Sequence, residues 1–113
     1  MWQKNTKTTL IPNYLLDFTN TASLKLDEAY VYALQISTLY FKKVQGKFYT
    51  QFSLISYNPY MFPKYLSNFK KYKNCRKSFF FQYIIIYKII NNHVRILDIF
   101  HYRSNYNKSI SPI

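Results

Sequence analysis

Residues 79–100 have the sequence FFFQYIIIYKIINNHVRILDIF, and most of the expected β-sheet lies in this stretch. The run 79–90 is rich in aromatic and β-branched residues, which favour extended strands. Asn91 and Asn92 tolerate left-handed backbone angles and therefore suit a tight turn. We predict an antiparallel β-hairpin in which this run pairs with residues 94–100.

Upstream of the sheet the sequence changes to helical periodicity. The apolar residues that recur at steps of three and four are Leu26, Ala29, Tyr30, Ala33 and Ile36. Such a stripe occupies one side of an α-helix, and it predicts a helix over about residues 21–36. Thr19, Asn20 and Thr21 precede the stripe, and these residue types cap helices by accepting hydrogen bonds from unpaired N–H groups.

A second helix is expected to follow directly, because Ser37 and Thr38 supply a turn and a new cap. Its apolar stripe consists of Val44, Phe48, Phe52 and Ile55. Gly46 lies inside this helix and costs about 1 kcal/mol relative to alanine. Pro59 and Pro63 end the helix, because proline cannot continue the backbone hydrogen-bond ladder. The two helices are expected to form an antiparallel hairpin that packs against the sheet.

The apolar run from Tyr14 to Phe18 predicts a short strand ahead of the first helix. The predicted fold class is α+β, with an N-terminal strand and an antiparallel helical hairpin packed on a small antiparallel β-sheet. A chain of 113 residues matches the size of one domain. We expect a flexible lead-in over residues 1–12, a single domain over 13–106 and a flexible tail over 107–113.

The chain is strongly basic, with 16 Lys and Arg against 4 Asp and Glu, a formal net charge of +12. Residues 1–58 hold six Lys and three acids, a net charge of +3, and residues 59–113 hold ten basic residues and one acid, a net charge of +9. A field of this sign attracts phosphate polymers, anionic membranes or acidic proteins, and does not choose among them.

Other features of the sequence restrict the chemistry. Cys75 is the single cysteine, which excludes an intramolecular disulfide, and we interpret it as a buried free thiol in a reducing cytoplasm. No stretch approaches the ~20 apolar residues of a membrane span, and no secretory signal is apparent. The single glycine, Gly46, excludes a glycine-rich phosphate loop, and the acids are scattered. We expect no metal, no cofactor, no small-molecule substrate and no membrane partner.

Several short motifs follow one another along the chain. In order, they are Tyr14-Leu15-Leu16-Asp17-Phe18 ahead of a helix that begins near Ala22, the segment Leu54 to Pro63 with Tyr57, Pro59 and Phe62, Arg76 seven residues before Tyr83-Ile84-Ile85-Ile86-Tyr87, and Asn91-Asn92 followed by Val94 to His101-Tyr102-Arg103-Ser104-Asn105. This set, over about residues 13–106, resembles the RelE/ParE superfamily of toxins from type II toxin-antitoxin systems. The resemblance implies a cytoplasmic, growth-inhibiting toxin that an acidic antitoxin holds silent.

The resemblance leaves two activities open, since RelE-like members are ribosome-dependent endoribonucleases and ParE-like members poison DNA gyrase. The expected hairpin over about residues 21–57 is similar to the long hairpin of ParE-like toxins. The arginine that RelE-like toxins carry after the first tyrosine of the central strand is absent here, because Ile84 follows Tyr83. We therefore favour inhibition of DNA gyrase, with ribosome-dependent cleavage of mRNA as the alternative.

For a RelE-like enzyme, the resemblance implies His101, Arg103 and Arg76 as the catalytic residues. Metal-independent cleavage of translated mRNA needs a base for the 2′-hydroxyl proton and cations for the developing phosphate charge. The alternation of side chains along a strand predicts one shared face for the residues Arg95, Leu97, Ile99 and His101. A structural residue at the end of a strand is the simpler interpretation of His101.

The C-terminal half also carries candidates for binding nucleic acid or a partner protein. They are Lys70, Lys71, Lys73, Lys77, Arg95 and Tyr106. Cations neutralise phosphates or carboxylates, and tyrosines between them can stack on bases. A solvated loop is the simpler interpretation of the lysine run. A basic nucleic-acid-binding domain that is not a toxin is the third alternative.

Overall fold

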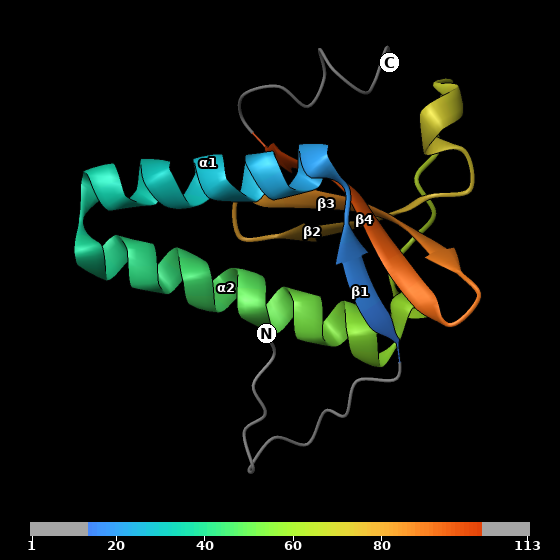
Figure 1. Ribbon diagram of the computed structural model, residues 1–113, viewed down its shortest axis with the longest axis horizontal. Helices are drawn as coiled ribbons and strands as arrows, with labels where there is room; N and C mark the ends of the chain where they lie inside the picture. The colour runs from blue at the N-terminus through green and yellow to red at the C-terminus, as the bar shows by residue number, and fades with distance from the viewer. Residues whose placement is uncertain (1–13, 103–113) are drawn as a thin grey trace.

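The computed structural model describes residues 14–102, and Figure 1 shows two long helices lying beside a β-sheet. The elements in chain order are β1 (Leu15–Phe18), α1 (Asn20–Ile36), α2 (Thr38–Tyr57), the 3-10 helices η1 (Pro59–Met61) and η2 (Lys70–Tyr72), β2 (Arg76–Phe80), β3 (Tyr83–Ile90) and β4 (His93–His101). The predicted α+β fold, with a strand ahead of a helical hairpin packed on a sheet, is confirmed. The expected lead-in over 1–12, the expected tail over 107–113, Arg103 and Tyr106 lie outside the described residues.

Side-chain caps fix the beginning of both helices. The Thr19 hydroxyl accepts a hydrogen bond from the Ala22 N–H at 3.1 Å, and the Ser37 hydroxyl accepts one from the Tyr40 N–H at 2.9 Å. The N–H of Ser37 also donates to the carbonyl of Ala33, so one residue ends α1 and begins α2. Both predicted caps are confirmed, and the single linking residue makes the hairpin tight.

The sheet has the strand order β1-β4-β3-β2, and β1 pairs with β4 in parallel. The sequence led us to expect an antiparallel sheet, and this holds only for β2, β3 and β4. Two helices of similar length return the chain to the end of the sheet where β1 began. Three further strands that alternate in direction then leave β4 running the same way as β1 (Figure 1).

The run 79–90 is divided into two strands, not one as predicted. Phe81 and Gln82 form the turn between β2 and β3, and Phe81 has a φ of 52°. A bulky aromatic residue is uncommon in the left-handed region, so nothing in the residue types signals this turn. The predicted turn at Asn91 and Asn92 is confirmed, and Asn91 has a φ of 55°.

A β-bulge in β4 changes which side chains share a face. Ile86 pairs with Asp98 and Tyr87 pairs with Ile96, so Leu97 is an extra residue in β4. Because the side-chain period of a strand is two, one inserted residue exchanges the two faces beyond it. The expected common face of Arg95, Leu97, Ile99 and His101 is therefore wrong, since Ile99 packs with the helices and Leu97 packs on the other side.

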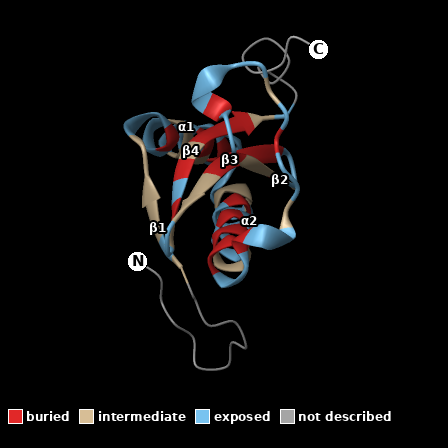
Figure 2. Cartoon of the chain, turned by 90° about the vertical axis from the view of Figure 1, so that its right-hand side faces the viewer, coloured by how far each residue is buried: buried red, intermediate tan, exposed pale blue. Residues whose placement is uncertain are grey.

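The sheet separates two apolar clusters of different size. The helix-side core lies between the sheet and the helices, and its buried members are Ala22, Ala29, Ala33, Val44, Phe48, Phe52, Ile55, Tyr83, Ile85, Tyr87, Val94, Ile96 and Ile99. The loop-side core lies under the segment 64–75, and its buried members are Tyr65, Tyr72, Cys75, Ile84, Ile86 and Phe100. Figure 2 shows buried residues in red along β3 and on the inner side of α2. The free, buried thiol of Cys75 is confirmed.

The start of α1 covers the edge of β4 where β1 has ended. The N–H and hydroxyl of Thr19 donate to the carbonyls of Ile96 and Leu97, at 3.0 and 2.9 Å. Further along, the Lys25 ammonium lies 3.0 Å from a carboxylate oxygen of the buried Asp98. The Tyr72 hydroxyl donates to the other oxygen at 3.1 Å. Asp98 thus connects α1, the bulge of β4 and the loop-side core.

Candidate functional site

His101 lies at the end of β4 on the helix side of the sheet. Its ring meets the Tyr83 ring edge-on, with centroids 5.2 Å apart. The imidazole borders a small cavity of about 130 Å³ beneath α1, which Lys25, Glu28 and Tyr32 also line. His101 therefore has an acid, a cation and hydroxyl groups as neighbours, while the Lys25 ammonium is already bound to a carboxylate.

Arg76 begins β2 and holds the chain that follows α2. Its guanidinium donates to the carbonyl of Phe62 at 2.7 Å and to that of Tyr60 at 3.5 Å. The same group lies over the Tyr60 ring, 5.3 Å from its centroid. Because the nitrogen Nη1 makes both hydrogen bonds and one face of the guanidinium covers the Tyr60 ring, Arg76 is placed to support the turn around η1.

The structure does not bring Arg76 and His101 together. Arg76 pairs with Tyr87 on one side of β3, and His101 pairs with Tyr83 on the other side. Four residues of strand separate these two pairs, which corresponds to about 13 Å along the sheet. Arg103, the third residue of the expected nuclease set, lies outside the described residues.

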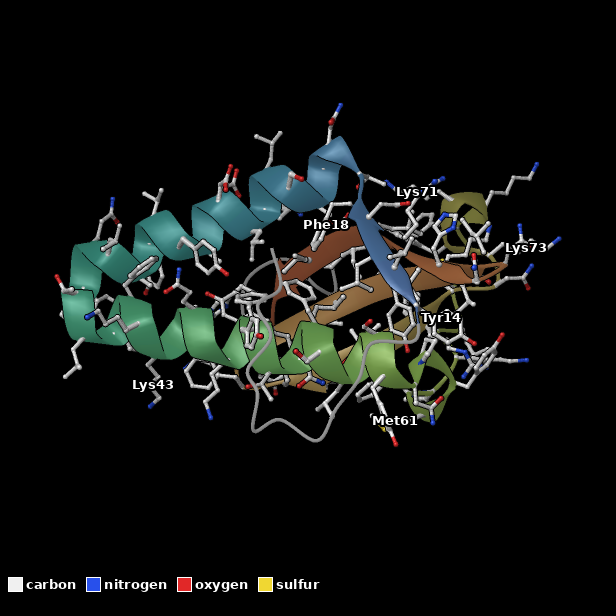
Figure 3. All side chains as sticks on the ribbon, turned by 60° about the horizontal axis from the view of Figure 1, so that its bottom comes forward. Tyr14, Phe18, Lys43, Met61, Lys71 and Lys73 are labelled. Carbon is white, nitrogen blue, oxygen red and sulfur yellow. The ribbon has the colours of Figure 1, made fainter. Side chains whose placement is uncertain are left out.

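The candidate partner-binding lysines lie on and beside η2. Lys70, Lys71 and Lys73 are exposed, and Figure 3 shows Lys71 and Lys73 at one end of the molecule. The Lys71 ammonium lies 5.2 Å from the centroid of the Tyr72 ring. Lys77 lies on β2 with its ammonium within 6 Å of the ring centroids of Tyr65 and Phe79. These lysines form a cationic surface that aromatic rings support.

Arg95 lies on the same side of the sheet as these lysines, but it already has an acidic partner. Its guanidinium donates to Asp17 at 2.9 Å, and this hydrogen bond raises the pKa of Arg95 above its usual value. His93 approaches the other oxygen of Asp17 at 3.3 Å. Lys88 pairs directly with Arg95 across the strands, and like charges in such a position repel. The single carboxylate of Asp17 therefore contacts both Arg95 and His93, beside the further positive charge of Lys88.

A mainly apolar hollow lies between the two helices and was not anticipated from the sequence. This interhelical groove has a volume of about 750 Å³ and is lined by Phe18, Leu26, Tyr30, Lys42, Gln45, Gly46, Tyr49 and Phe52. It lies beside β1, which is an edge strand of the sheet. The one sequence feature that points to the groove is Gly46, which the sequence analysis treats only as a weak position in the helix. A Cβ at this position would meet no atom within 4 Å, so the space beside it is open.

Burial changes the chemistry of the tyrosine in the small cavity. Burial raises the pKa of Tyr83 to about 12, and the neighbouring Tyr40 and Tyr32 add to the shift. This phenol is therefore neutral at physiological pH.

Within residues 14–102, His, Cys, Asp and Glu side chains form no group that could hold a metal ion, and neither helix is long and apolar enough to cross a membrane.

These features describe a small cationic α+β domain of the toxin type that the sequence resembles. Residues 16–106 match the family model of the ParE toxin of type II toxin-antitoxin systems, parDE. The match covers most of the chain, and the chain therefore belongs to the ParE toxin family. Membership implies a cognate antitoxin as partner.

A solved structure supports the same fold. A chain described as belonging to the chromosomal ParDE toxin-antitoxin system from P. aeruginosa superimposes with a TM-score of 0.61 at 16% sequence identity. The alignment covers 79% of the present chain and 96% of that chain. At this identity the likeness concerns the fold alone. No curated protein matches the sequence significantly.

Proposed function

We propose that this ParE-family toxin acts in the cytoplasm by binding and inhibiting DNA gyrase, and that an acidic antitoxin neutralises it. One observation carries the choice of a binding mechanism. Arg76 and His101 lie on opposite sides of β3 and four strand residues apart, and one guanidinium nitrogen of Arg76 donates to the carbonyls of Phe62 and Tyr60. A nuclease that relies on His101 and Arg76 needs both beside one phosphate, and this separation favours a toxin that acts through its surface.

Inhibition of purified DNA gyrase tests this proposal. Added in excess over gyrase, the toxin should block supercoiling of relaxed plasmid, and the His101→Ala variant should block it equally well. A reaction with ribosomes and mRNA serves as the counter-test. Normal supercoiling together with cleavage of mRNA that His101→Ala abolishes would reject the gyrase proposal and establish the RelE-like alternative.

The interhelical groove is the surface that suits the antitoxin. Its apolar walls, formed by side chains such as Phe18, Leu26 and Phe52, can bury one side of a segment that folds as it binds. Lys42 lines the same groove and offers a cation to an acidic partner. The antitoxin would thereby cover apolar surface beside the edge strand β1.

A pair of matched substitutions on α2 tests the groove. Gln45 lines the groove and Thr50 is exposed on α2 outside it. The probe is the cognate antitoxin, titrated against each variant by calorimetry. Gln45→Glu should weaken binding by about tenfold through charge repulsion, and Thr50→Glu should leave it nearly unchanged. Equal affinities would remove the groove from the proposal.

A further inference from the structure

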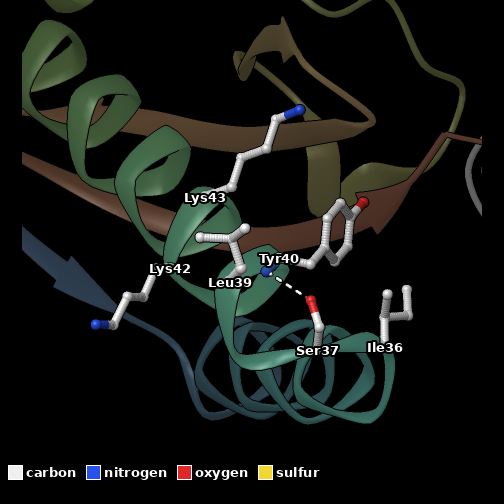
Figure 4. A pocket seen from close by; sticks show the side chains of 6 residues that line it. All are labelled: Ile36, Ser37, Leu39, Tyr40, Lys42 and Lys43. Atoms are coloured by element: carbon white, nitrogen blue, oxygen red, sulfur yellow. Dashed lines mark hydrogen bonds between the residues drawn. The ribbon is translucent and has the colours of Figure 1, made fainter.

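The turn between α1 and α2 projects beyond the strands at one end of the molecule (Figure 1). Here a further hollow forms, which is separate from the cavity under His101 and from the interhelical groove. We name the surface around it the tip patch, and its members are Ile36, Leu39, Tyr40, Lys42, Lys43, Lys47 and Phe81. In Figure 4, Lys42 and Lys43 point away from each other on either side of Leu39.

Large apolar side chains of the tip patch are exposed. Leu39 is 79% exposed at the second position of α2, and Ile36 is 53% exposed at the end of α1. Neighbouring exposed apolar side chains that polar residues surround are characteristic of interaction surfaces. Neither residue contributes to the helix-side core. Folding alone therefore does not account for leucine and isoleucine at this turn.

Phe81 adds an aromatic ring to the patch at the cost of a strained backbone. Its φ of 52° lies in the left-handed region, and its side chain is 39% exposed. The ammonium groups of Lys43 and Lys47 lie 5.4 and 5.6 Å from the centroid of its ring. Backbone strain in a bulky residue concentrates at functional sites, where the surrounding structure maintains it. The two lysines hold this ring at the surface.

The charge of the tip patch is positive throughout. Lys42, Lys43 and Lys47 all come from α2, which contains no acidic residue. The exposed acids of α1 are Asp27 and Glu28, and Glu28 precedes Ile36 by eight residues, about 12 Å along the helix. With a chain charge of +12, a second copy would be repelled from this surface, so the complementary partner is acidic.

We propose that the tip patch inserts into a cleft of the toxin's target protein, with Leu39 entering an apolar floor and the lysines meeting carboxylates on its walls. This inference depends on the proposed function only for the identity of the target protein, which we propose to be DNA gyrase. A projecting tip is the shape that a cleft accepts, whereas the recessed groove between the helices suits a segment that folds onto the toxin. Lys42 lines both surfaces, so Lys43 and Lys47 are the charges that distinguish them.

Leu39→Glu tests the apolar anchor without disturbing the core. A carboxylate in the first turn of α2 interacts favourably with the helix dipole, so the variant should keep its circular dichroism spectrum and melting temperature. Leu24→Glu is the matched control, because Leu24 is 61% exposed on α1 and is not in the patch. Leu39→Glu should require about tenfold more protein than Leu24→Glu to halve growth on induction and to halve supercoiling.

Charge reversal tests the lysines. Lys43→Glu/Lys47→Glu should weaken growth inhibition by about tenfold or more, because the new carboxylates would meet carboxylates. Lys64→Glu/Lys88→Glu makes the same change in net charge at positions outside the tip patch. Equal loss of activity in the two double variants would mean that only net charge matters, and it would overturn the proposal.

The two readouts separate this inference from the identity of the target. If folded Leu39→Glu inhibits growth as strongly as Leu24→Glu, the tip patch is not the target surface, whatever gyrase does. If the wild-type chain leaves supercoiling unchanged but its growth inhibition still depends on Leu39, Lys43 and Lys47, the gyrase proposal fails and the tip patch stands.

Discussion

The two faces of the sheet are stabilised in different ways. The helix side is covered by α1 and α2, and its contacts are mainly apolar, with aromatic rings packed around Phe48. The loop side is covered by an irregular segment over 64–75, and a buried carboxylate, Asp98, ties Tyr72 and Lys25 together across it. Apolar packing follows from residue type and spacing. The hydrogen-bonded contacts of Asp98, which we call the polar tie, depend instead on a small number of specific partners.

The largest expected effect belongs to the helix side. Phe48 is fully buried, and its ring lies 5.8 Å or less from the centroids of Tyr30, Phe52, Phe80 and Tyr83. Phe48→Ala should lower the free energy of unfolding by about 3–5 kcal/mol, because it removes buried surface and leaves a cavity. Urea denaturation measures this loss. Phe69→Ala on the partly exposed loop side should cost well under half as much, and a similar loss in both would contradict the distinction between the faces.

A smaller loss is expected where the polar tie is cut. Asp98→Ala leaves the buried Tyr72 hydroxyl without its acceptor and Lys25 without its carboxylate, so the free energy of unfolding should fall by about 2–4 kcal/mol. Asp17→Ala is the matched control, since Asp17 also has two partners but its side chain is 46% exposed, against 8% for Asp98. That exposed group should contribute about 1 kcal/mol or less. Equal losses would show that burial of the tie is unimportant.

The same division explains what the sequence could predict. The caps at Thr19 and Ser37, the turn at Asn91 and the helical stripes apart from the exposed Ile36 depend on local residue types, and these were predicted. The turn at Phe81 was missed because its residue types favour a strand and long-range contacts with α2 hold it in place. A register shift, such as the bulge in β4, also depends on partners distant in sequence.

The candidate site follows the same rule. Sequence motifs predicted cations in the second half of the chain, and those within residues 14–102 do lie on or beside the sheet. Motifs could not predict that Arg76 is committed to the carbonyl of Phe62, because that contact depends on how the chain leaves α2. The interhelical groove could not be predicted either, since its walls come from three separate elements, β1, α1 and α2.

Alkaline pH should weaken the loop side through the buried thiol of Cys75. Burial raises the pKa of Cys75 to about 11 from 9.0, and the charge of Lys88 opposes this shift only in part. A raised pKa in the folded state means that its contribution to stability is complete below pH 9 and is lost as the pH rises towards 11. The loss between pH 9 and pH 11 should be about 2 kcal/mol. The difference in unfolding free energy between wild type and Cys75→Ala should change by this amount over that range. A constant difference would show that the folded thiol titrates normally.

The smallest expected effect is a gain in stability, and it concerns the helix side. Gly46 lies in α2 with open space around its missing Cβ, so Gly46→Ala should raise the free energy of unfolding by about 0.5–1 kcal/mol through lower backbone entropy in the unfolded chain. Thermal unfolding measures this gain. If the helix side were limited by packing at this position, the added methyl group would have no benefit. A stabilised variant that also binds the antitoxin more weakly would mean that the glycine keeps the interhelical groove open, because Gly46 lines that groove. In that case the helix defect noticed in the sequence would be a feature of the binding surface, retained at the expense of stability.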